Sequence, residues 1–332
     1  NFFDALEASI RHKDEKAAKQ VMGALQAFVA APHSEHKKIQ ALKKIQASGV
    51  STDFTQLTEK AFTLTVESDN FDLGWQTAFR EVPLAEGRLS WQIYNVANGL
   101  TFNKIEEGDK IEVQGLSGSL VTANADYYGG AIGWTDKMIR AREIPAMVDL
   151  AETFRNKFWA NKADNFYALL AAVITANPAN VVAYQGAAAD GRLQRDILTI
   201  NQCAFQIGNE NKDKGFGDMA NAPMVIYANP ADNERIEAAF RAITNSLATA
   251  GRGGDEVTAR RISRIYTYNS NITAGLPLMV LPGQKMQRAE VMAPTTYGPE
   301  LDILSLNQVQ SVWSIYGGVV ADSDQVYQFT LA

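Results

Sequence analysis

The chain has 332 residues, of which 20% are charged and 46% are hydrophobic, and its formal net charge is −6. These values are typical of globular proteins with room for two domains, so they exclude a disordered chain and a coiled coil. The negative charge disfavours a nucleic-acid reader acting alone, the single Cys203 excludes an intrachain disulfide, and no apolar run has the length of a transmembrane helix.

Residues 1–50 are predicted to form a helical arm, because apolar residues recur there at helical spacing. The first 48 residues carry eight basic and five acidic side chains. The basic ones are Arg11, Lys13, Lys16, Lys19, Lys37, Lys38, Lys43 and Lys44. Two interpretations stay open: a solvated arm, or a basic arm that faces a polyanion or lies across a neighbouring subunit. The chain begins at Asn1 rather than Met, which fits either a trimmed start or proteolytic maturation.

Residues 88–113 are predicted to form a long β-hairpin, with turn signals at Gly99 and at residues 106–109. Its apolar side chains Trp91, Ile93 and Phe102 are isolated among polar neighbours. Because a two-stranded hairpin without a core is marginally stable in water, we expect it to dock on another copy of the chain.

A helix is predicted over residues 145–175, where apolar residues recur at helical spacing and no proline follows until Pro178. Pro145 is tolerated in the first helical turn, where its missing N–H has no partner in any case. The apolar stretch at residues 71–79 is expected to pack against this helix. Residues 127–130 (YYGG) are predicted to form a tight aromatic corner that leads back to it.

The remainder is predicted to be small-residue rich near residue 181, to form a polar loop at residues 208–221, and then to form mostly strands. Between a strand at residues 222–227 and one at residues 261–268 we expect a helix at residues 231–250, with Asp232 as its N-cap. Arg260, Arg261 and Arg264 are expected on a charged edge strand. The further strands are expected at residues 276–281, 290–292, 301–306, 311–320 and 326–331. This order favours an α+β fold over a doubly wound sheet.

No catalytic, cofactor-binding or metal-binding residue is predicted. The sequence lacks G-x-G-x-x-G, Walker A, H-E-x-x-H and G-x-S-x-G motifs, and its three histidines all lie in the arm. One cysteine and three clustered histidines do not supply a thiolate zinc site or a histidine-based active site. We therefore expect no enzyme activity and no cofactor.

The order of these parts resembles the major capsid protein of tailed bacteriophages with the HK97-like fold. Residues 91–96 and 110–113 look like the two strands of that family's extended loop, and residues 131–170 look like the entry and body of its spine helix. Residues 223–243 resemble the strand and helix of the axial domain, and residues 315–331 resemble the closing strands.

The resemblance implies five segments. They are an N-terminal helical arm (1–50), a strand and extended-loop (E-loop) region (51–120), a peripheral (P) domain with the spine helix (121–180), an axial (A) domain (181–282), and late strands that return to both domains (283–332).

The resemblance also implies a structural virion protein that assembles as pentamers and hexamers of an icosahedral capsid around double-stranded DNA, held by non-specific contacts. Intersubunit contact would involve Trp91, Ile93, Phe102, Lys104 and Lys110 of the hairpin, and the basic arm would face DNA. The family's other partners are portal, decoration and scaffolding proteins, its location is the virion capsid, and its assembly takes place in the host cytoplasm. Some relatives crosslink a hairpin lysine to an asparagine; for Lys104, Lys110 and Asn307 we expect ordinary solvated side chains instead.

Three alternatives stay open. An encapsulin-type nanocompartment would have a similar fold but enclose cargo enzymes, a soluble α+β enzyme would be a monomer or small oligomer with a polar cleft, and a phage tube or tail component would form helical stacks.

Overall fold

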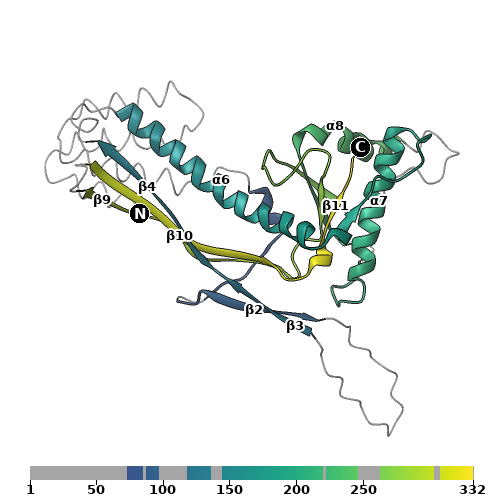
Figure 1. The fold of residues 1–332 in the computed structure, drawn as a ribbon, viewed down its shortest axis with the longest axis horizontal. Coiled ribbons are helices and arrows are strands. Elements are labelled where there is room, and N and C mark those ends of the chain that lie inside the picture. Colours follow the sequence, from purple (N-terminus) through teal and green to yellow (C-terminus); the bar gives the residue numbers. More distant parts are fainter. Residues whose placement is uncertain are drawn as a thin grey trace, which may run out of the picture. The chain divides into compact units, whose positions relative to one another are not determined.

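A computed structural model describes residues 73–84, 87–96, 118–135, 144–219, 222–245, 262–302 and 307–331 (Figure 1). They fall into two compact units: one holds the described residues of 127–160 and 292–315, and the other those of 72–126, 161–291 and 316–332. The predicted basic arm and the hairpin residues Phe102, Lys104 and Lys110 lie outside the described residues.

The longest helix among the described residues, α6 (Ile144–Ala176), confirms the helix predicted over residues 145–175. Its 33 residues correspond to about 50 Å at 1.5 Å per residue. Pro145 occupies the second position, and the helix ends just before Asn177 and Pro178, since a residue that precedes proline disfavours helical geometry. Among the described helices, none has the length and apolar character needed to cross a membrane.

Phe166 of α6 is the centre of an aromatic cluster within the second unit. Trp75, from the short helix η1 (Gly74–Thr77), stacks on it with ring centroids 3.9 Å apart, and Phe79 and Tyr316 approach it at 5.1 and 5.9 Å. The predicted packing of the apolar stretch around residue 75 against the long helix is therefore confirmed for its described residues.

A five-stranded mixed sheet forms the core of the same unit, in the order β5-β11-β8-β6-β7. Its strands are β5 (Val181–Val182), β6 (Met224–Ala228), β7 (Ile262–Tyr266), β8 (Leu278–Val280) and β11 (Val326–Phe329). β6 pairs parallel with β7 through the crossover helix α8 (Asn233–Asn245), while β8 runs antiparallel to β6 and β11. All of β6 is buried, as expected for a central strand with an unbroken apolar run. The strands predicted at residues 222–227, 261–268, 276–281 and 326–331 are confirmed over their described residues. The helix predicted at residues 231–250 is confirmed over residues 233–245, and residues 246–250 lie outside the described residues.

Helix α7 (Arg192–Asn211) corrects the prediction that residues from 208 form a polar loop (Figure 1). Ile197, Ile200, Ala204 and Ile207 are buried at successive helical positions and pack in the core that includes β11. The amide-rich composition of this helix obscured its apolar face. The loop begins only after Asn211.

A four-stranded sheet has the order β1-β9-β10-β4, formed by β1 (Arg80–Glu81), β4 (Asp126–Thr135), β9 (Met286–Asp302) and β10 (Asn307–Val320). β9 is one strand of 17 residues where two short strands were predicted. Although prolines usually occupy strand edges or bulges, this strand contains Pro294 and Pro299.

The predicted aromatic corner at residues 127–130 is wrong, because these residues lie inside β4. A Cβ at Gly129 would stand 3.1 Å from the Trp313 Cβ, and one at Gly130 would stand 3.1 Å from the Phe154 ring. The two glycines therefore serve close packing against neighbouring side chains rather than a turn.

Candidate functional site

The extended ribbon consists of β2 (Ser90–Val96) and β3 (Gly118–Asn124), which pair antiparallel over seven positions. Trp91 lies opposite Ala123, and Tyr94 lies opposite Leu120. The predicted return strand at residues 110–113 lies outside the described residues, and the described partner of β2 is β3, which was predicted as connecting chain. The predicted end of the hairpin at residue 113 is therefore too early, because the strand that pairs with β2 continues to Asn124.

The ribbon has one buried and one exposed face. Trp91 and Ile93 are 8% and 4% exposed, whereas Tyr94 and Leu120 on the opposite face are 66% and 45% exposed. The expectation that Trp91 and Ile93 need another copy of the chain for cover is wrong, because the single chain already buries them. Their alternation with Tyr94 follows the two-residue period of a strand.

The root of the ribbon approaches the end of β10 very closely. A Cβ at Gly317 would overlap the backbone of Asn124 and would stand 2.9 Å from the Cα of Ala125. Ala125 N also donates a hydrogen bond of 2.8 Å to Leu89 O, which closes the base of the ribbon. Glycine is required at position 317 because two backbones meet there.

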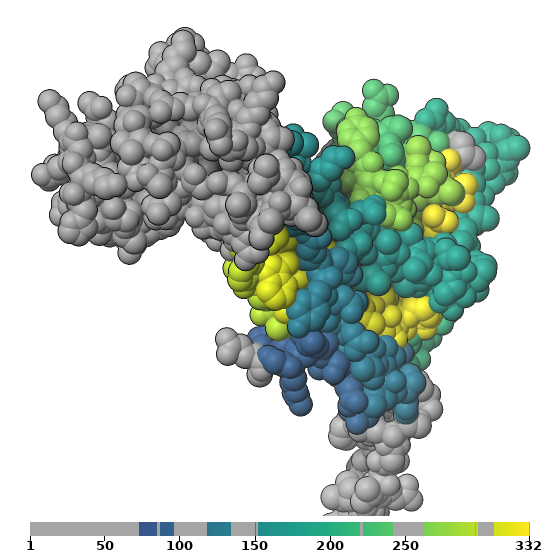
Figure 2. All heavy atoms as spheres, turned by 60° about the vertical axis from the view of Figure 1, so that its left-hand side comes forward, coloured from purple at the N-terminus to yellow at the C-terminus, as the bar shows by residue number. Residues whose placement is uncertain are grey.

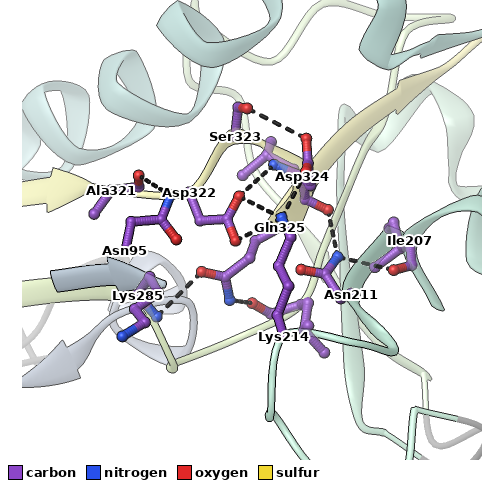
Figure 3. A network of polar contacts seen from close by, with 12 residues as sticks. Asn95, Ile207, Asn211, Lys214, Lys285, Ala321, Asp322, Ser323, Asp324 and Gln325 are labelled. Atoms are coloured by element: carbon purple, nitrogen blue, oxygen red, sulfur yellow. Dashed lines mark hydrogen bonds and ion pairs between the residues drawn. The ribbon is translucent and has the colours of Figure 1, made fainter. Parts of the chain in front are cut away.

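Near the other end of β2, at Tyr94 and Asn95, lies a network that we call the polar hub, formed by Asn211, Lys214, Asp322, Asp324 and Gln325 (Figure 3). The Lys214 ammonium lies 2.8 Å from both carboxylate oxygens of Asp322 and 2.5 Å from Oδ2 of Asp324. Asp322 is 3% exposed and also caps the short helix η5 (Ser323–Gln325) by accepting from Asp324 N. A carboxylate this deeply buried requires a partner, and Lys214 supplies it.

The charge state of the hub follows from these contacts. Burial disfavours the charged Lys214 ammonium, but its hydrogen bonds and ion pairs with Asp322 and Asp324 outweigh burial and raise its pKa. Lys214 is therefore a cation at neutral pH. Asn211 adds a link to α7 by donating to Ile207 O at 2.8 Å and to Asp324 O at 2.7 Å.

The hub continues into the ribbon through Lys285 and Ala321. Lys285 N donates to Oε1 of Gln325 at 3.1 Å, and Ala321 N donates to Lys285 O at 3.1 Å. Lys285 Nζ then donates to Tyr94 O at 2.5 Å, and Asn95 Nδ2 donates to Ala321 O at 3.2 Å. In Figure 2 the yellow residues near the C-terminus border both the teal residues of α7 and the blue residues of the ribbon.

Two other ion pairs of the second unit each contain a nearly fully buried charge. Lys162, 2% exposed, pairs with Glu290 at 3.0 Å and lies 4.9 Å from the centre of the Tyr316 ring. The Asp196 carboxylate forms an ion pair with the Arg235 guanidinium, with 2.5 Å between Asp196 Oδ1 and Arg235 Nη2. The buried charges of Lys162 and Asp196 each have an opposite partner, which is the arrangement expected of structural pairs.

Of the arginines expected on a charged edge strand, Arg264 is described and lies there, whereas no capping hydrogen bond from Asp232 to α8, its predicted role, is found among the described contacts. Arg264 lies on the edge strand β7, 3.3 Å from Glu237, with its guanidinium 4.5 Å from the Phe240 ring centre. The described position directly before α8 is Asp232, whose carboxylate accepts a hydrogen bond from Gly275 N at 2.9 Å. Among the described residues, no group of three metal-binding side chains comes together.

Known proteins match this chain in fold but not in sequence. No protein-family model matches the chain, and no curated protein matches its sequence. The solved capsid of Myoviridae phage XM1 matches with a TM-score of 0.51 at 11% identity, over 80% of this chain and 95% of that one. A chain of Mycobacterium phage Cain matches with a TM-score of 0.50 at 12% identity, over 79% of this chain and 91% of that one.

The chain has the HK97-like capsid fold. This confirms the predicted α+β class and the predicted resemblance, at sequence identities of 11–12%. The HK97-like chain also contains the polar hub, which the sequence analysis did not predict. The sequence feature that could have indicated the hub is the segment ADSDQ at residues 321–325, which lies between two predicted strands. There Asp322 can cap a turn and lie close to Asp324.

Proposed function

We propose that the chain is a major capsid protein, a structural and non-enzymatic subunit of an icosahedral bacteriophage shell around double-stranded DNA. The observation that carries this proposal is the fold, which covers 95% of the capsid chain of phage XM1. The proposed location is the virion capsid, with assembly in the host cytoplasm.

The proposal gives each segment a part in the shell. Residues 121–180 and 181–282 are the peripheral and axial domains, and the late strands at residues 283–332 join both. Copies associate head to tail around rotation axes as hexamers and pentamers, because heterologous contacts that close by rotation form rings.

The burial of the ribbon refines its proposed role. Trp91 and Ile93 anchor the ribbon on its own chain, so we assign the contact with a neighbouring subunit to the outer face, which carries Tyr94 and Leu120. These two exposed apolar side chains lie directly opposite each other on adjacent strands. Phe102, Lys104 and Lys110 belong to the same proposed contact.

Assembly of the purified full-length chain tests the proposal. Negative-stain microscopy and light scattering should find closed particles tens of nanometres across, and the double change Tyr94→Ser with Leu120→Ser should prevent their formation. Tyr268→Ser, at a side chain 85% exposed just after strand β7, is the matched control and should leave assembly intact. A stable 36.3-kDa monomer of the unaltered chain would refute the shell.

The contents of the particles test the DNA partner. Nuclease-protected DNA supports the capsid, whereas a co-purifying cargo protein would indicate an encapsulin-type compartment. If the basic arm holds DNA, shells lacking residues 1–48 should release it at lower salt, since backbone contacts are salt-dependent. Unchanged retention would assign the arm to architecture alone. Portal, decoration and scaffolding proteins are further proposed partners.

A further inference from the structure

We propose that the polar hub is a latch that holds β2 of the extended ribbon, at Tyr94 and Asn95 near the end of the strand away from the root, to the C-terminal end of α7. In this latch the Lys214 ion pairs determine how firmly β2 and β3 are anchored. The inference concerns the single chain and does not depend on the proposed function.

One short segment, residues 321–325, connects the two sides. Its carboxylates at Asp322 and Asp324 bind Lys214, which lies three residues beyond Asn211, the last residue of α7. Its other members, Ala321 and Gln325, bind the ribbon side (Figure 3). A shift of this segment therefore changes contacts on both sides together.

The ribbon side of the latch consists of two side-chain hydrogen bonds. Asn95 Nδ2 donates to the carbonyl of Ala321, and Lys285 Nζ donates to the carbonyl of Tyr94. Lys285 is itself bound through its backbone to Ala321 and to Gln325. Both bonds thus end on residues whose position is fixed by the segment that Lys214 holds.

A strained backbone conformation next to Lys285 is a second observation in favour of the latch. Gln284 has a φ of 54°, a left-handed conformation that costs free energy for residues other than glycine. The fully buried Gln325 donates from Nε2 to Leu281 O at 3.2 Å and to Gly283 O at 3.3 Å, which holds the turn that contains Gln284. Such a conformation persists only while its surroundings hold it, so loosening Gln325 should also release Lys285.

The exposure of the ion pairs explains how the latch can open. Lys214 is 16% exposed and Asp324 is 33% exposed, so water reaches this half of the bridge. Asp322 is 3% exposed, and loss of Lys214 would leave its carboxylate buried without its cation. The segment would then move to hydrate Asp322, while Trp91 and Ile93 remain as the apolar anchor.

Hydrogen–deuterium exchange of the purified, unassembled full-length chain tests the latch. Lys214→Met should accelerate amide exchange at residues 90–96 and 118–124 by at least about tenfold, with the buried strand β6 unchanged. Lys212→Met is the matched control, because Lys212 makes an exposed hydrogen bond of 3.0 Å to Asn209, and it should leave the ribbon unchanged. Faster exchange confined to α7 and η5, with an unchanged ribbon, would overturn the proposal.

A second variant keeps the test decisive if Lys214→Met fails to fold. Asn95→Ala combined with Lys285→Met cuts the ribbon side and leaves the Lys214 ion pairs in place. It should accelerate exchange of the ribbon without changing exchange at residues 207–214. Unchanged ribbon exchange in this double variant would show that the apolar face alone anchors the ribbon, and would refute the latch.

Discussion

Phe166→Ala should be among the most destabilising single substitutions in the chain. The Phe166 side chain is 2% exposed, and removing a buried phenylalanine side chain costs about 3–5 kcal/mol. Its stack on Trp75, with centroids 3.9 Å apart and planes at 7°, contributes about 0.5–1.5 kcal/mol beyond burial. A Cβ at Gly318 would stand 2.6 Å from the Phe166 ring, so a strand backbone borders the resulting cavity and limits its collapse. We therefore expect a loss near the upper limit, about 4–5 kcal/mol.

Urea unfolding of the unassembled chain, followed by the fluorescence of its five tryptophans, measures this loss. The matched control is Phe205→Ala on α7, where the side chain is 59% exposed and the expected change is within about 0.5 kcal/mol. A loss below about 1 kcal/mol for Phe166→Ala, or equal losses for both variants, would refute the assignment of Phe166 as the centre of the aromatic cluster.

Two other predictions concern the ribbon root and alkaline stability. Gly317→Ser should destabilise the chain by at least about 2 kcal/mol in thermal unfolding, because its Cβ would overlap the backbone of Asn124, whereas Gly191→Ser adds a Cβ in open space and should be neutral; equal melting curves would contradict the close approach. Burial, reinforced by carboxylates such as Asp324, raises the pKa of Tyr327 from 10.0 to about 12, so its neutral form is favoured in the folded chain. The contribution of this group to the free energy of unfolding is fully present below pH 10. Between pH 10 and 12 it should fall by up to about 1.4 kcal/mol per pH unit, because the unfolded chain loses the Tyr327 proton first. Tyr327→Phe should remove that part of the fall in urea midpoints, and an identical alkaline loss in the variant would count against it.

The sequence was sufficient for elements whose pattern is long and local. Helix α6 was predicted within one residue at either end, because its apolar period lasts from Met147 to Val173, about seven turns, and prolines lie near both limits. Strand β6 was predicted because five consecutive apolar residues between a proline and an Asn-Pro pair have no other ready interpretation. The order of such elements led to the HK97-like fold, although no family model and no curated protein sequence matches the chain.

Features that depend on distant residues were predicted poorly. Gly129 and Gly130 were predicted to form a turn, but the structure shows that glycine is needed there because Trp313 and Phe154 pack directly against these positions. Trp91 and Ile93 read as uncovered because their cover comes from outside the ribbon. The polar hub joins residues more than 100 positions apart, such as Lys214 and Asp322, and no spacing rule relates them. Contacts of this kind are properties of the topology, which a local pattern does not encode.

The single cysteine of the chain has a practical consequence. Cys203 is fully buried on α7, and burial raises the pKa of its thiol, so the nucleophilic thiolate is scarce while the core is closed. Any event that lets a maleimide reach it must first part α7 from the sheet beneath. Each molecule therefore has a single site whose labelling by a maleimide reports that the core has opened. The fraction of molecules with the mass of the labelled chain gives the fraction that has opened.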